Sequence, residues 1–295
     1  MKYILSILIL NYKSAEETIS LYKEVKELKN EEFRILVIDN ASGENEECKL
    51  RKEILNEDLK ILNKNLGYAG GNNVGIQEAI AMNIPYVLLL NPDIRLHENC
   101  VDTLLKTIRE DTELAAVGPR ICFRDNAKLI YSDGGMVDKE QGFFTYHLNN
   151  KKIMKDIRME NKIKHVDYVN GSVFLARTAV FERIGYMLED FFLYFEETEW
   201  CLRAKGFGYN LVTNSEALAF HLSSPKGVLF YYYITRNRLL LSKIYPEYYK
   251  KTEAIIRRQL FREVKRNVKK FKLPGDKLKA KLRGYFAGRA QSIIK

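Results

Sequence analysis

The sequence is poor in cysteine and has no long apolar run. Its four cysteines, Cys48, Cys100, Cys122 and Cys201, lie far apart in 295 residues, without the paired spacing of a disulfide framework or a zinc site. This usage is typical of a reducing compartment and predicts a cytoplasmic protein. No apolar stretch is long enough to cross a bilayer. The apolar start, "YILSILIL" at 3–10, is followed by no small-residue cleavage site, so a buried first strand is expected rather than a signal peptide.

The usual nucleotide-binding fingerprints are also missing. The glycine-rich stretch "NKNLGYAGGNNVG" at 63–75 is not the dinucleotide-binding fingerprint, and it has no Lys-Ser/Thr pair of a P-loop. Its glycines would let the backbone approach a phosphate, and the N-terminus of the helix expected to follow attracts anions. A turn that needs glycine for its own conformation explains the stretch equally well.

Positive charge is concentrated at the C-terminal end. The chain has a net charge of +10, but residues 250–295 contain 16 Lys and Arg and only three acidic residues, so the rest is slightly acidic. Apolar residues recur at helical spacing within this tail, on both sides of a break at Pro274-Gly275. They are Ile256, Leu260, Val264 and Val268, then Leu278, Leu282, Tyr285 or Phe286, and Ile293. The pattern predicts two basic amphipathic helices.

Two uses of this tail are open from the sequence. Either the apolar faces pack on the rest of the protein and the charges are solvated, or the helices lie on an anionic membrane leaflet. The confinement of the charge to the tail favours membrane contact. Charge alone would also suit nucleic acid, but no nucleic-acid motif accompanies it, so no nucleic-acid partner is expected.

Apolar runs alternate with helical patterns through the first part of the chain. Strands are expected at 3–10, 33–39, 59–63 and 86–90, and helices at 14–28 and 70–83, the first with Ser14 and Glu17 spaced as a capping box. This alternation predicts an α/β fold with a mostly parallel sheet. Beyond it the sequence predicts a long loop or hairpin at 123–165, a strand at 165–177, a short helix at 177–185, and a helix and strand within 191–212.

Polar side chains follow four successive predicted strands. They are Asn11, then Asp39 and Asn40, then Asn65, then Asn91 and Asp93. Asn and Asp favour turns at any single strand end, but ligands of α/β sheets bind where the carboxyl ends of the strands converge, so the set predicts a binding site. In "LLLNPDI", Asp93 can bind a hard divalent cation whose other ligands come from substrate phosphates. A plain Asn-Pro-Asp turn is the alternative.

The densest acidic cluster is "YFEETEW" at 194–200, with Glu196, Glu197 and Glu199. A helix dipole favours carboxylates at a helix start. A carboxylate facing an aromatic-lined pocket would also serve as a general base toward a hydroxyl. Arg203 is expected to pair with Glu199 one turn away. Farther on, His221 follows an apolar stretch and is a candidate second metal ligand opposite Asp93, although a lone histidine is more often a packed residue.

Six motifs occur in a characteristic order: "ILNYK", "VIDNASG", "NLGYAGGNNVG", "LLLNPDI", "YVNGSVFLARTAVFERIG" and "FFLYFEETEWCLRAKGFGY". Their order and spacing, with His221 after them, resemble the family 2 glycosyltransferases, and most closely the rhamnosyltransferase-like branch that builds bacterial surface polysaccharides. The resemblance covers roughly residues 3–240. It implies a GT-A fold, Rossmann-like, with a nucleotide-binding half at about 1–95 and an acceptor half at 96–240, followed by the basic helical tail at 241–295.

The same resemblance implies an activity and roles for individual residues. Inverting transfer of a sugar, first of all L-rhamnose from dTDP-L-rhamnose, would extend a lipid-linked polysaccharide precursor at the inner face of the plasma membrane. Asn11, Asp39, Asn40 and Asn65 would contact the nucleotide and Asn72 the donor. Asn91 and Asp93 occupy the positions of the family's DxD motif, Asp93 and His221 would hold Mn²⁺ or Mg²⁺, and Glu197 would be the catalytic base. Glu196, Arg236 and Arg238 are expected on the acceptor side.

Two departures from the family pattern bear on these roles. The first acid of the DxD motif is Asn91 here, so only Asp93 brings charge to the metal, and the base position holds Glu197 where Asp is commoner. Other readings stay open: transfer from UDP-galactofuranose or a UDP-hexosamine, or a catalytically inactive nucleotide-sugar-binding scaffold. The intact Glu197, Asp93 and His221 argue against the scaffold.

Overall fold

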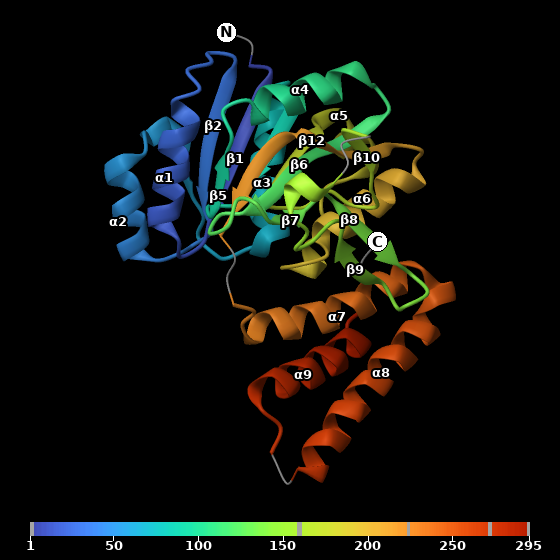
Figure 1. Ribbon diagram of the computed structural model, residues 1–295. Coiled ribbons are helices and arrows are strands. Elements are labelled where there is room, and N and C mark those ends of the chain that lie inside the picture. Colours follow the sequence, from blue (N-terminus) through green and yellow to red (C-terminus); the bar gives the residue numbers. More distant parts are fainter. Residues whose placement is uncertain (1–2, 158–160, 223–224, 271–272, 294–295) are drawn as a thin grey trace.

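The computed structural model describes residues 3–157, 161–222, 225–270 and 273–293. Its centre is a ten-stranded mixed sheet with helices on both faces (Figure 1). In spatial order the main strands are β10 (Ile163–His165), β12 (Asn210–His221), β6 (Leu114–Phe123), β11 (Val173–Arg177), β4 (Tyr86–Leu90), β1 (Leu5–Asn11), β2 (Phe33–Asp39) and β3 (Leu59–Ile61). Two short strands join at the side, β5 (Ile94–Leu96) on β12 and β7 (Ile130–Ser132) on β6.

The predicted parallel sheet is confirmed for the first half of the chain. Strands β1, β2, β3 and β4 pair in parallel, with Asn11 in register with Asp39. The sheet becomes mixed beyond β4, because β11 runs antiparallel to both β4 and β6. The carboxyl ends of β1, β2 and β4 therefore lie at one edge, the edge that faces α7 in Figure 1.

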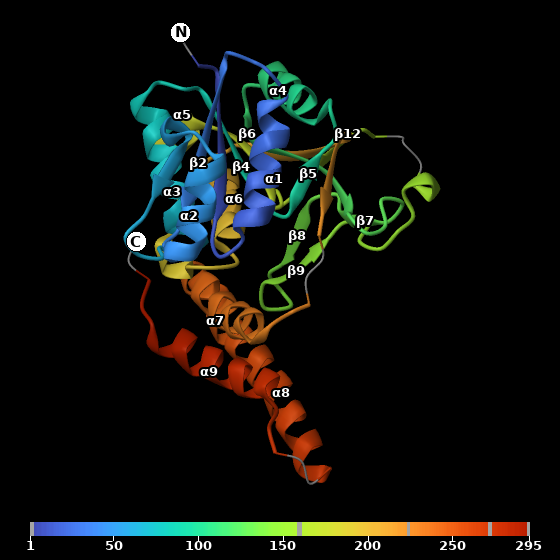
Figure 2. The same ribbon diagram turned by 90° about the vertical axis from the view of Figure 1, so that its left-hand side faces the viewer.

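Alternating side chains of the buried strands build the two layers. In β1, Leu5, Ile7 and Ile9 face one hydrophobic core, and Leu8 and Leu10 face the other. The first core is covered by α1 (Ala15–Lys26), α2 (Glu44–Glu53) and α4 (Cys100–Glu110), the second by α3 (Gly67–Ala81), α5 (Thr178–Ile184) and α6 (Glu196–Gly206). Figure 2 shows α1 and α4 on one side of the strands and α3 and α5 on the other. A central strand apolar on both faces, such as β4, needs both layers.

The capping box predicted at the start of α1 does not form. The Ser14 side chain makes no capping hydrogen bond, and the Ser14 amide instead donates to Asn11 Oδ1 at 3.2 Å. Glu17 is unavailable for the box because its carboxylate pairs with Arg95 at 2.5 Å and Arg124 at 2.7 Å. The charged partners bind Glu17 more strongly than a backbone amide would.

The irregular stretch at 123–165 contains the predicted hairpin. It is β8 (Gly135–Asp138) paired with β9 (Phe144–His147); residues 158–160 of this stretch lie outside the described residues. The strand predicted at 165–177 is shorter than expected, since β11 begins only at Val173. A turn at Asn170 interrupts it, with the Ser172 and Val173 amides directed to the Asn170 side chain and carbonyl.

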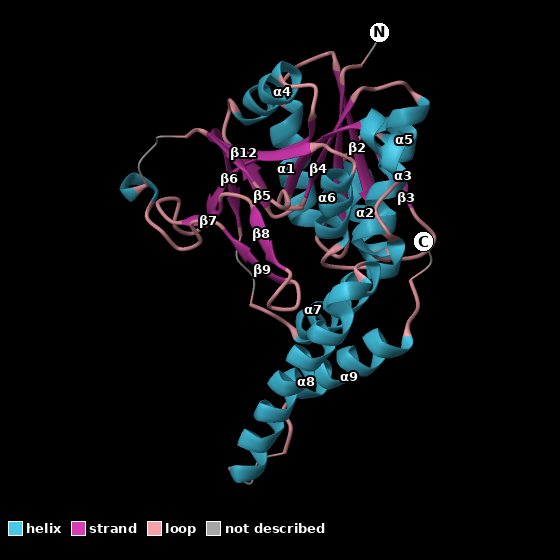
Figure 3. Ribbon diagram, turned by 90° about the vertical axis from the view of Figure 1, so that its right-hand side faces the viewer, coloured by secondary structure: helices cyan, strands magenta, loops and turns pink. Residues whose placement is uncertain are grey.

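Three helices form the C-terminal region, α7 (Val228–Ile244), α8 (Pro246–Lys269) and α9 (Asp276–Ala290), which project from one end of the sheet (Figures 1 and 3). The helix break predicted at Pro274-Gly275 is confirmed. Helix α7 packs on the sheet-bearing part through Leu240 and Leu241, and on α8 and α9 through Leu239. The predicted division at residue 240 thus falls inside a helix that both parts share. Among the described residues, no helix is long and apolar enough to cross a membrane.

Candidate active site

The ends of β1 and β2 are joined by a buried polar network. Asn11 Nδ2 donates to Asp39 Oδ1 at 2.7 Å and to Ser42 Oγ at 3.1 Å. Asn11 Oδ1 accepts from the Thr18 hydroxyl at 2.8 Å. Because both ends of the Asn11 amide are bound by the protein and Asn11 is wholly buried, Asn11 reaches the site through Asp39, which it holds in place.

A second network fastens the glycine-rich stretch to the end of β2. Asn40 Nδ2 donates to Asn65 Oδ1 at 3.0 Å and to the Gly67 carbonyl at 2.9 Å, and Asn40 Oδ1 accepts from the Leu66 amide. Helix α3 starts at Gly67, three residues before the predicted start. Gly67 has φ +72°, and a Cβ there would lie 2.2 Å from the Phe192 carbonyl oxygen, so glycine is required. One turn into α3, buried Asn72 donates to the Tyr68 carbonyl at 3.0 Å.

Asp93 and His221 are brought together by strand pairing. Strand β5 runs antiparallel to β12 with Ile94 opposite His221. The Asp93 carboxylate Oδ2 then lies 3.6 Å from His221 Nε2. Asn91, two residues earlier, is held by its backbone N–H, which donates to the Ser172 carbonyl at 3.0 Å. Asp93 and His221, which are far apart in the sequence, therefore lie side by side.

Asp93 and His221 are the two side chains here that could ligate a divalent cation. Asp93 Oδ1 and His221 Nδ1 are both buried and have no hydrogen-bond partner among the described residues. Two adjacent ligand atoms bound at about 2.1 Å and at right angles to one ion lie about 3 Å apart, near the observed 3.6 Å. Burial lowers the pKa of His221 against the opposing effect of Asp93, which favours the neutral imidazole that binds metals.

No cluster of three or more metal-ligating side chains occurs in the described part of the chain. Two protein ligands suit an ion that takes its remaining ligands from water and substrate phosphates, as Mg²⁺ does. The residues present therefore fit a divalent cation that binds together with a diphosphate.

Tyr131, His147 and Asn170 form a chain of contacts that begins at the His221 ring. The Tyr131 ring stacks on His221 with centroids 4.7 Å apart and planes 6° from parallel, and the His147 ring meets Tyr131 edge-on at 5.2 Å. The Asn170 amide nitrogen lies 3.3 Å from His147 Nε2. Burial lowers the pKa of His147 to about 4, so His147 is neutral and can accept this hydrogen bond. None of these three residues was expected from the sequence to lie at the site.

The turn at Asn170-Gly171-Ser172 lies between the Asp93–His221 pair and the acidic cluster. Ser172 binds Asn91, as described above, and the Gly171 carbonyl accepts from the Tyr68 hydroxyl at 2.5 Å. A Cβ at Gly171 would lie 3.5 Å from Glu197 Cγ. Burial raises the pKa of Tyr131, and the charges of Asp93 and Glu197 add to the effect, so both carboxylates lie near one phenol.

Glu196 and Glu197 begin α6 directly after a strained turn. Phe192, Tyr194 and Phe195 have φ angles of 61°, 67° and 77°, a left-handed conformation that is costly for aromatic residues. Buried Asn237 of α7 holds this turn, because its Nδ2 donates to the carbonyls of Phe191 and Leu193 at 2.9 Å and of Tyr194 at 2.6 Å. The turn directs the first carboxylates of α6 toward the Gly171 side of the site.

The two carboxylates differ in environment. Glu196 is 3% exposed, whereas Glu197 is partly exposed. Each retains a buried Oε2 with no hydrogen-bond partner among the described residues. Burial raises the pKa of Glu197 to about 7, and burial together with the Glu197 charge raises the pKa of Glu196 further. Glu197 is thus the member of the pair that ionises near neutral pH, as a general base requires.

The other predicted residues have structural partners. Arg203 binds Glu199 through two hydrogen bonds of 2.9 Å, which confirms the predicted i, i+4 pair. Arg238 donates to the Gly142 and Gln141 carbonyls, and Arg236 to the Gln291 side chain and the Asp190 carbonyl. Both guanidinium groups are buried among these acceptors rather than joined to Glu197, so neither is free to meet an acceptor phosphate.

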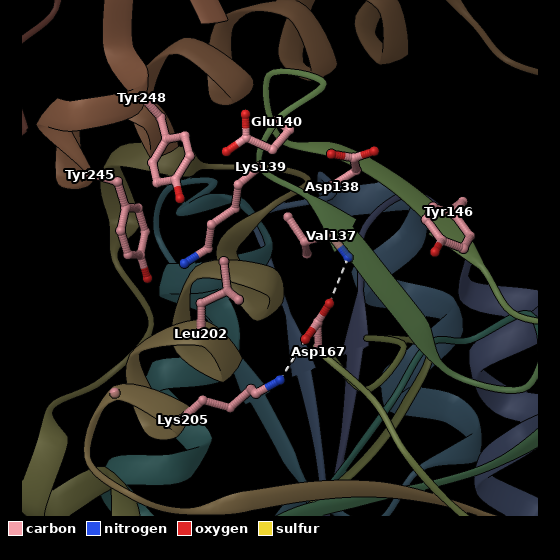
Figure 4. Close-up of a pocket in the computed structure, with 11 residues that line it drawn as sticks. Val137, Asp138, Lys139, Glu140, Tyr146, Asp167, Leu202, Lys205, Tyr245 and Tyr248 are labelled. Atoms are coloured by element: carbon pink, nitrogen blue, oxygen red, sulfur yellow. Dashed lines mark hydrogen bonds and ion pairs between the residues drawn. The ribbon is translucent and has the colours of Figure 1, made fainter. Parts of the chain in front are cut away.

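A hollow of about 620 Å³ lies elsewhere, between the β8–β9 hairpin, the C-terminal half of α6 and the start of α8 (Figure 4). Its lining includes the Lys205–Asp167 ion pair at 2.5 Å and Tyr146 of β9. Neighbouring residues of a strand point to opposite faces, so Tyr146 faces this hollow and His147 faces the candidate site. No residue predicted for the site lines the hollow.

Comparison with known proteins agrees with this geometry. The family model described as "Glycosyl transferase family 2" matches residues 6–185. The low-salt glycan biosynthesis hexosyltransferase Agl10 of Haloferax volcanii is 33% identical over 248 residues, 81% of this chain and 75% of the relative. The dTDP-rhamnosyl transferase RfbF of Shigella flexneri is 22% identical over 209 residues, 69% of this chain and 64% of the relative.

Among solved structures, the mannosyltransferase PcManGT of Pyrobaculum calidifontis, in complex with GDP-Man and Mn²⁺, has a TM-score of 0.60 at 11% identity. The match covers 98% of this chain and 86% of that one. The mixed sheet, its two helical layers and this likeness define a GT-A fold. The chain belongs to glycosyl transferase family 2.

The hydrogen bonds by which Asn237 holds the turn before α6 can be tested by replacing its donor group with an acceptor. Asn237→Asp replaces the amide that donates to three carbonyls by a buried acceptor, so we expect a loss of at least about 2 kcal/mol in the free energy of unfolding, measured in urea. Asn30→Asp is the control, because Asn30 is exposed and uses only its Oδ1, which aspartate retains. Equal stability of the two variants would show that these hydrogen bonds do not stabilise the turn.

Proposed function

We propose that this protein transfers a hexosyl residue, with inversion, from a nucleotide-diphospho-sugar to a hydroxyl group of a glycan acceptor. The observation that supports this best is the arrangement around the Asn170–Ser172 turn. Glu197, a carboxylate whose pKa burial raises to about 7, lies beside Gly171 of this turn, and Asp93 and His221 lie next to each other on the side of Asn91, which binds Ser172. This supports a single site that contains a base and two possible metal ligands. Inverting transfer needs one base and one means of neutralising the leaving diphosphate. It needs no second catalytic carboxylate, unlike the paired acids of glycoside hydrolases.

The donor side of the proposal rests on the strand ends of β1 and β2. We propose that Asp39 and Asn65 contact the nucleotide, with Asn11 holding Asp39 and Asn40 holding Asn65, and that Asn72 and Asn91 lie near the donor. The relatives are named for a hexosyl transfer and a dTDP-rhamnosyl transfer, and the structural neighbour binds GDP-Man. We therefore propose dTDP-L-rhamnose as the first donor to test, with UDP-galactofuranose and UDP-hexosamines as the alternatives.

Asp93 and His221 are the residues that would hold Mn²⁺ or Mg²⁺. The ion, when bound, would neutralise negative charge on the departing nucleoside diphosphate. Asp93 contributes the only carboxylate, since Asn91 is uncharged, so affinity for the ion should depend on the donor's own phosphates. The neighbour's complex with Mn²⁺ supports this choice of ion.

Glu197 is proposed to take the proton from the acceptor hydroxyl as that oxygen attacks the anomeric carbon. The attack comes from the face opposite the leaving group, so the configuration inverts. Glu196, buried and with the higher pKa of the two, would stay protonated and border the acceptor side. The acceptor itself is proposed to be a lipid-linked polysaccharide precursor at the cytoplasmic face of the plasma membrane, in keeping with the glycan biosynthesis named for Agl10 and with the basic tail.

The base assignment is tested by the paired variants Glu197→Gln and Glu196→Gln. We expect Glu197→Gln to lower the transfer rate at least about 100-fold while the donor still binds in calorimetry, because only proton removal is lost. Glu196→Gln should keep a rate within about tenfold of the wild type, because glutamine resembles the protonated carboxyl group that burial favours there. Near-normal turnover of Glu197→Gln would exclude Glu197 as the base.

The raised pKa of Glu197 predicts the pH dependence of transfer. A base must be ionised to accept a proton, so kcat/KM should fall about tenfold per pH unit below about 7 and level off above it. An unperturbed glutamate with a pKa of 4.5 would instead give a flat profile from pH 6 to 8. Steady-state rates across that range, with the metal held at saturation, distinguish the two outcomes.

The Asp93–His221 pair is tested by nucleotide binding rather than turnover. In calorimetry with dTDP and UDP, Mn²⁺ should strengthen binding to the wild type, and Asp93→Asn and His221→Ala should remove that enhancement. Asp125→Asn, an exposed aspartate outside the site, serves as the control and should retain it. An enhancement that survives both site variants would place the ion elsewhere.

A further inference from the structure

The predicted apolar stripe of α8 is occupied by other helices. Ile256 and Leu260 are 2% and 6% exposed and pack with Leu239 of α7 and with Leu278 and Tyr285 of α9. These residues therefore pack inside the protein, as one of the two alternatives predicted. They pack against the other C-terminal helices and not on the sheet-bearing part. Any surface on which α8 binds a partner must be its opposite face.

That opposite face combines arginine with an exposed aromatic ring. Arg257, Arg258 and Arg262 surround Phe261, and the four line a shallow surface depression of about 310 Å³. Phe261 is 67% exposed. Successive turns of a helix place residues four apart on one side, so Arg257, Phe261, Lys265 and Lys269 follow one another along this face.

The cations of this face are not paired within the protein. Among the described residues, no ion pair involves any of Arg257, Arg258, Arg262, Lys265 and Lys269. Val268, farther along the face, is also 67% exposed. The face thus presents five cations and two apolar side chains. We name the set Arg257, Arg258, Phe261, Arg262, Lys265, Val268 and Lys269 the basic face of α8.

The same combination continues beyond α8. Leu273, in the link to α9, is 90% exposed, and Phe286 of α9 is 61% exposed between Arg283 and Arg289. Figure 2 shows α8 extending away from the sheet, so the sheet-bearing part does not cover the far half of this helix. Exposed apolar residues and arginines therefore accompany each other over more than one element of the region.

We propose that the basic face of α8 docks on an anionic lipid bilayer. Arginine and lysine can bind the lipid phosphates while Phe261 and Val268 enter the boundary between headgroups and acyl chains. Nucleic acid would also satisfy the cations, and Phe261 could stack on a base, but the exposed Val268 and Leu273 have no use there. Docking on the membrane would bring the enzyme to its acceptor. It rests on the proposed function only in assuming that the acceptor is linked to the membrane.

Vesicle flotation of the full chain, without donor or acceptor, tests this. The wild type should float with vesicles containing phosphatidylglycerol and not with phosphatidylcholine alone. The triple variant Arg257→Gln, Arg258→Gln, Arg262→Gln should bind the anionic vesicles about 100-fold more weakly, since each cation contributes roughly fivefold. Phe261→Ser should weaken binding without changing its dependence on salt. All the changed side chains are exposed, so the thermal midpoints should stay at the wild-type value.

Matched variants on the sheet-bearing part are the controls. Phe207→Ser removes another exposed phenylalanine, and Lys52→Gln, Lys106→Gln, Lys128→Gln removes three exposed cations; both should float like the wild type. Failure of the wild type to float, normal flotation of the arginine variant, or equal loss in both triple variants would overturn the proposal. So would a wild type that ignores vesicles and binds a single-stranded DNA probe at 150 mM salt through the same arginines.

Flotation also separates this proposal from the proposed function. Vesicle binding is measured without turnover, so a failure of sugar transfer leaves its result intact. Conversely, the arginine variant should retain the wild-type transfer rate toward a water-soluble acceptor and lose rate only when the acceptor is embedded in anionic vesicles. Equal loss toward both acceptors would contradict a role confined to the membrane.

Discussion

The pairing of β5 with β12 is the constraint on which the site depends. It places His221 beside Asp93, although the two are far apart in the sequence, and it also fixes the Asn-Pro-Asp turn at the edge where β1 and β2 end. The Asn170–Ser172 turn lies between this pair and Glu197, because its Ser172 carbonyl accepts from the Asn91 backbone amide and its Gly171 lies beside Glu197. A shift of β12 by one residue would turn His221 away from Asp93, because neighbouring residues of a strand face opposite sides.

The parts of the site that could be predicted from sequence share a local signature. Asn11, Asp39, Asn65 and Asp93 each follow an apolar strand, and parallel strands bring such positions to one edge. Glu197 stood out because several carboxylates at a helix start are conspicuous. The position of His221 was inferred from the family resemblance and from its place after an apolar stretch, and the strand register explains it physically.

The parts that could not be predicted depend on contacts without a sequence period. Tyr131 and His147 lie in the irregular stretch before residue 165, where no periodicity indicates which side chains meet. Asn237 lies between two arginines in a mostly apolar helix and belongs to no motif, yet its side-chain amide supports the strained turn before Glu196. Arg236 and Arg238 resembled anion-binding groups in the sequence, but the structure buries both against oxygen acceptors of the protein. For the tail, helical spacing identified Ile256 and Leu260, which pack, but it grouped exposed Val268 with them and gave no indication of Phe261 on the opposite face.

The central claim is that Asp93 and His221 hold the ion of a glycosyltransferase site formed at the strand ends. Anomalous diffraction from crystals grown with Mn²⁺ and dTDP or UDP tests it most directly. The account predicts one manganese peak bonded to the Asp93 carboxylate, the His221 imidazole and the diphosphate, with the nucleoside against Asp39 and Asn65. A manganese peak bound to the diphosphate but to neither side chain, or a nucleotide seated away from these strand ends, would contradict it.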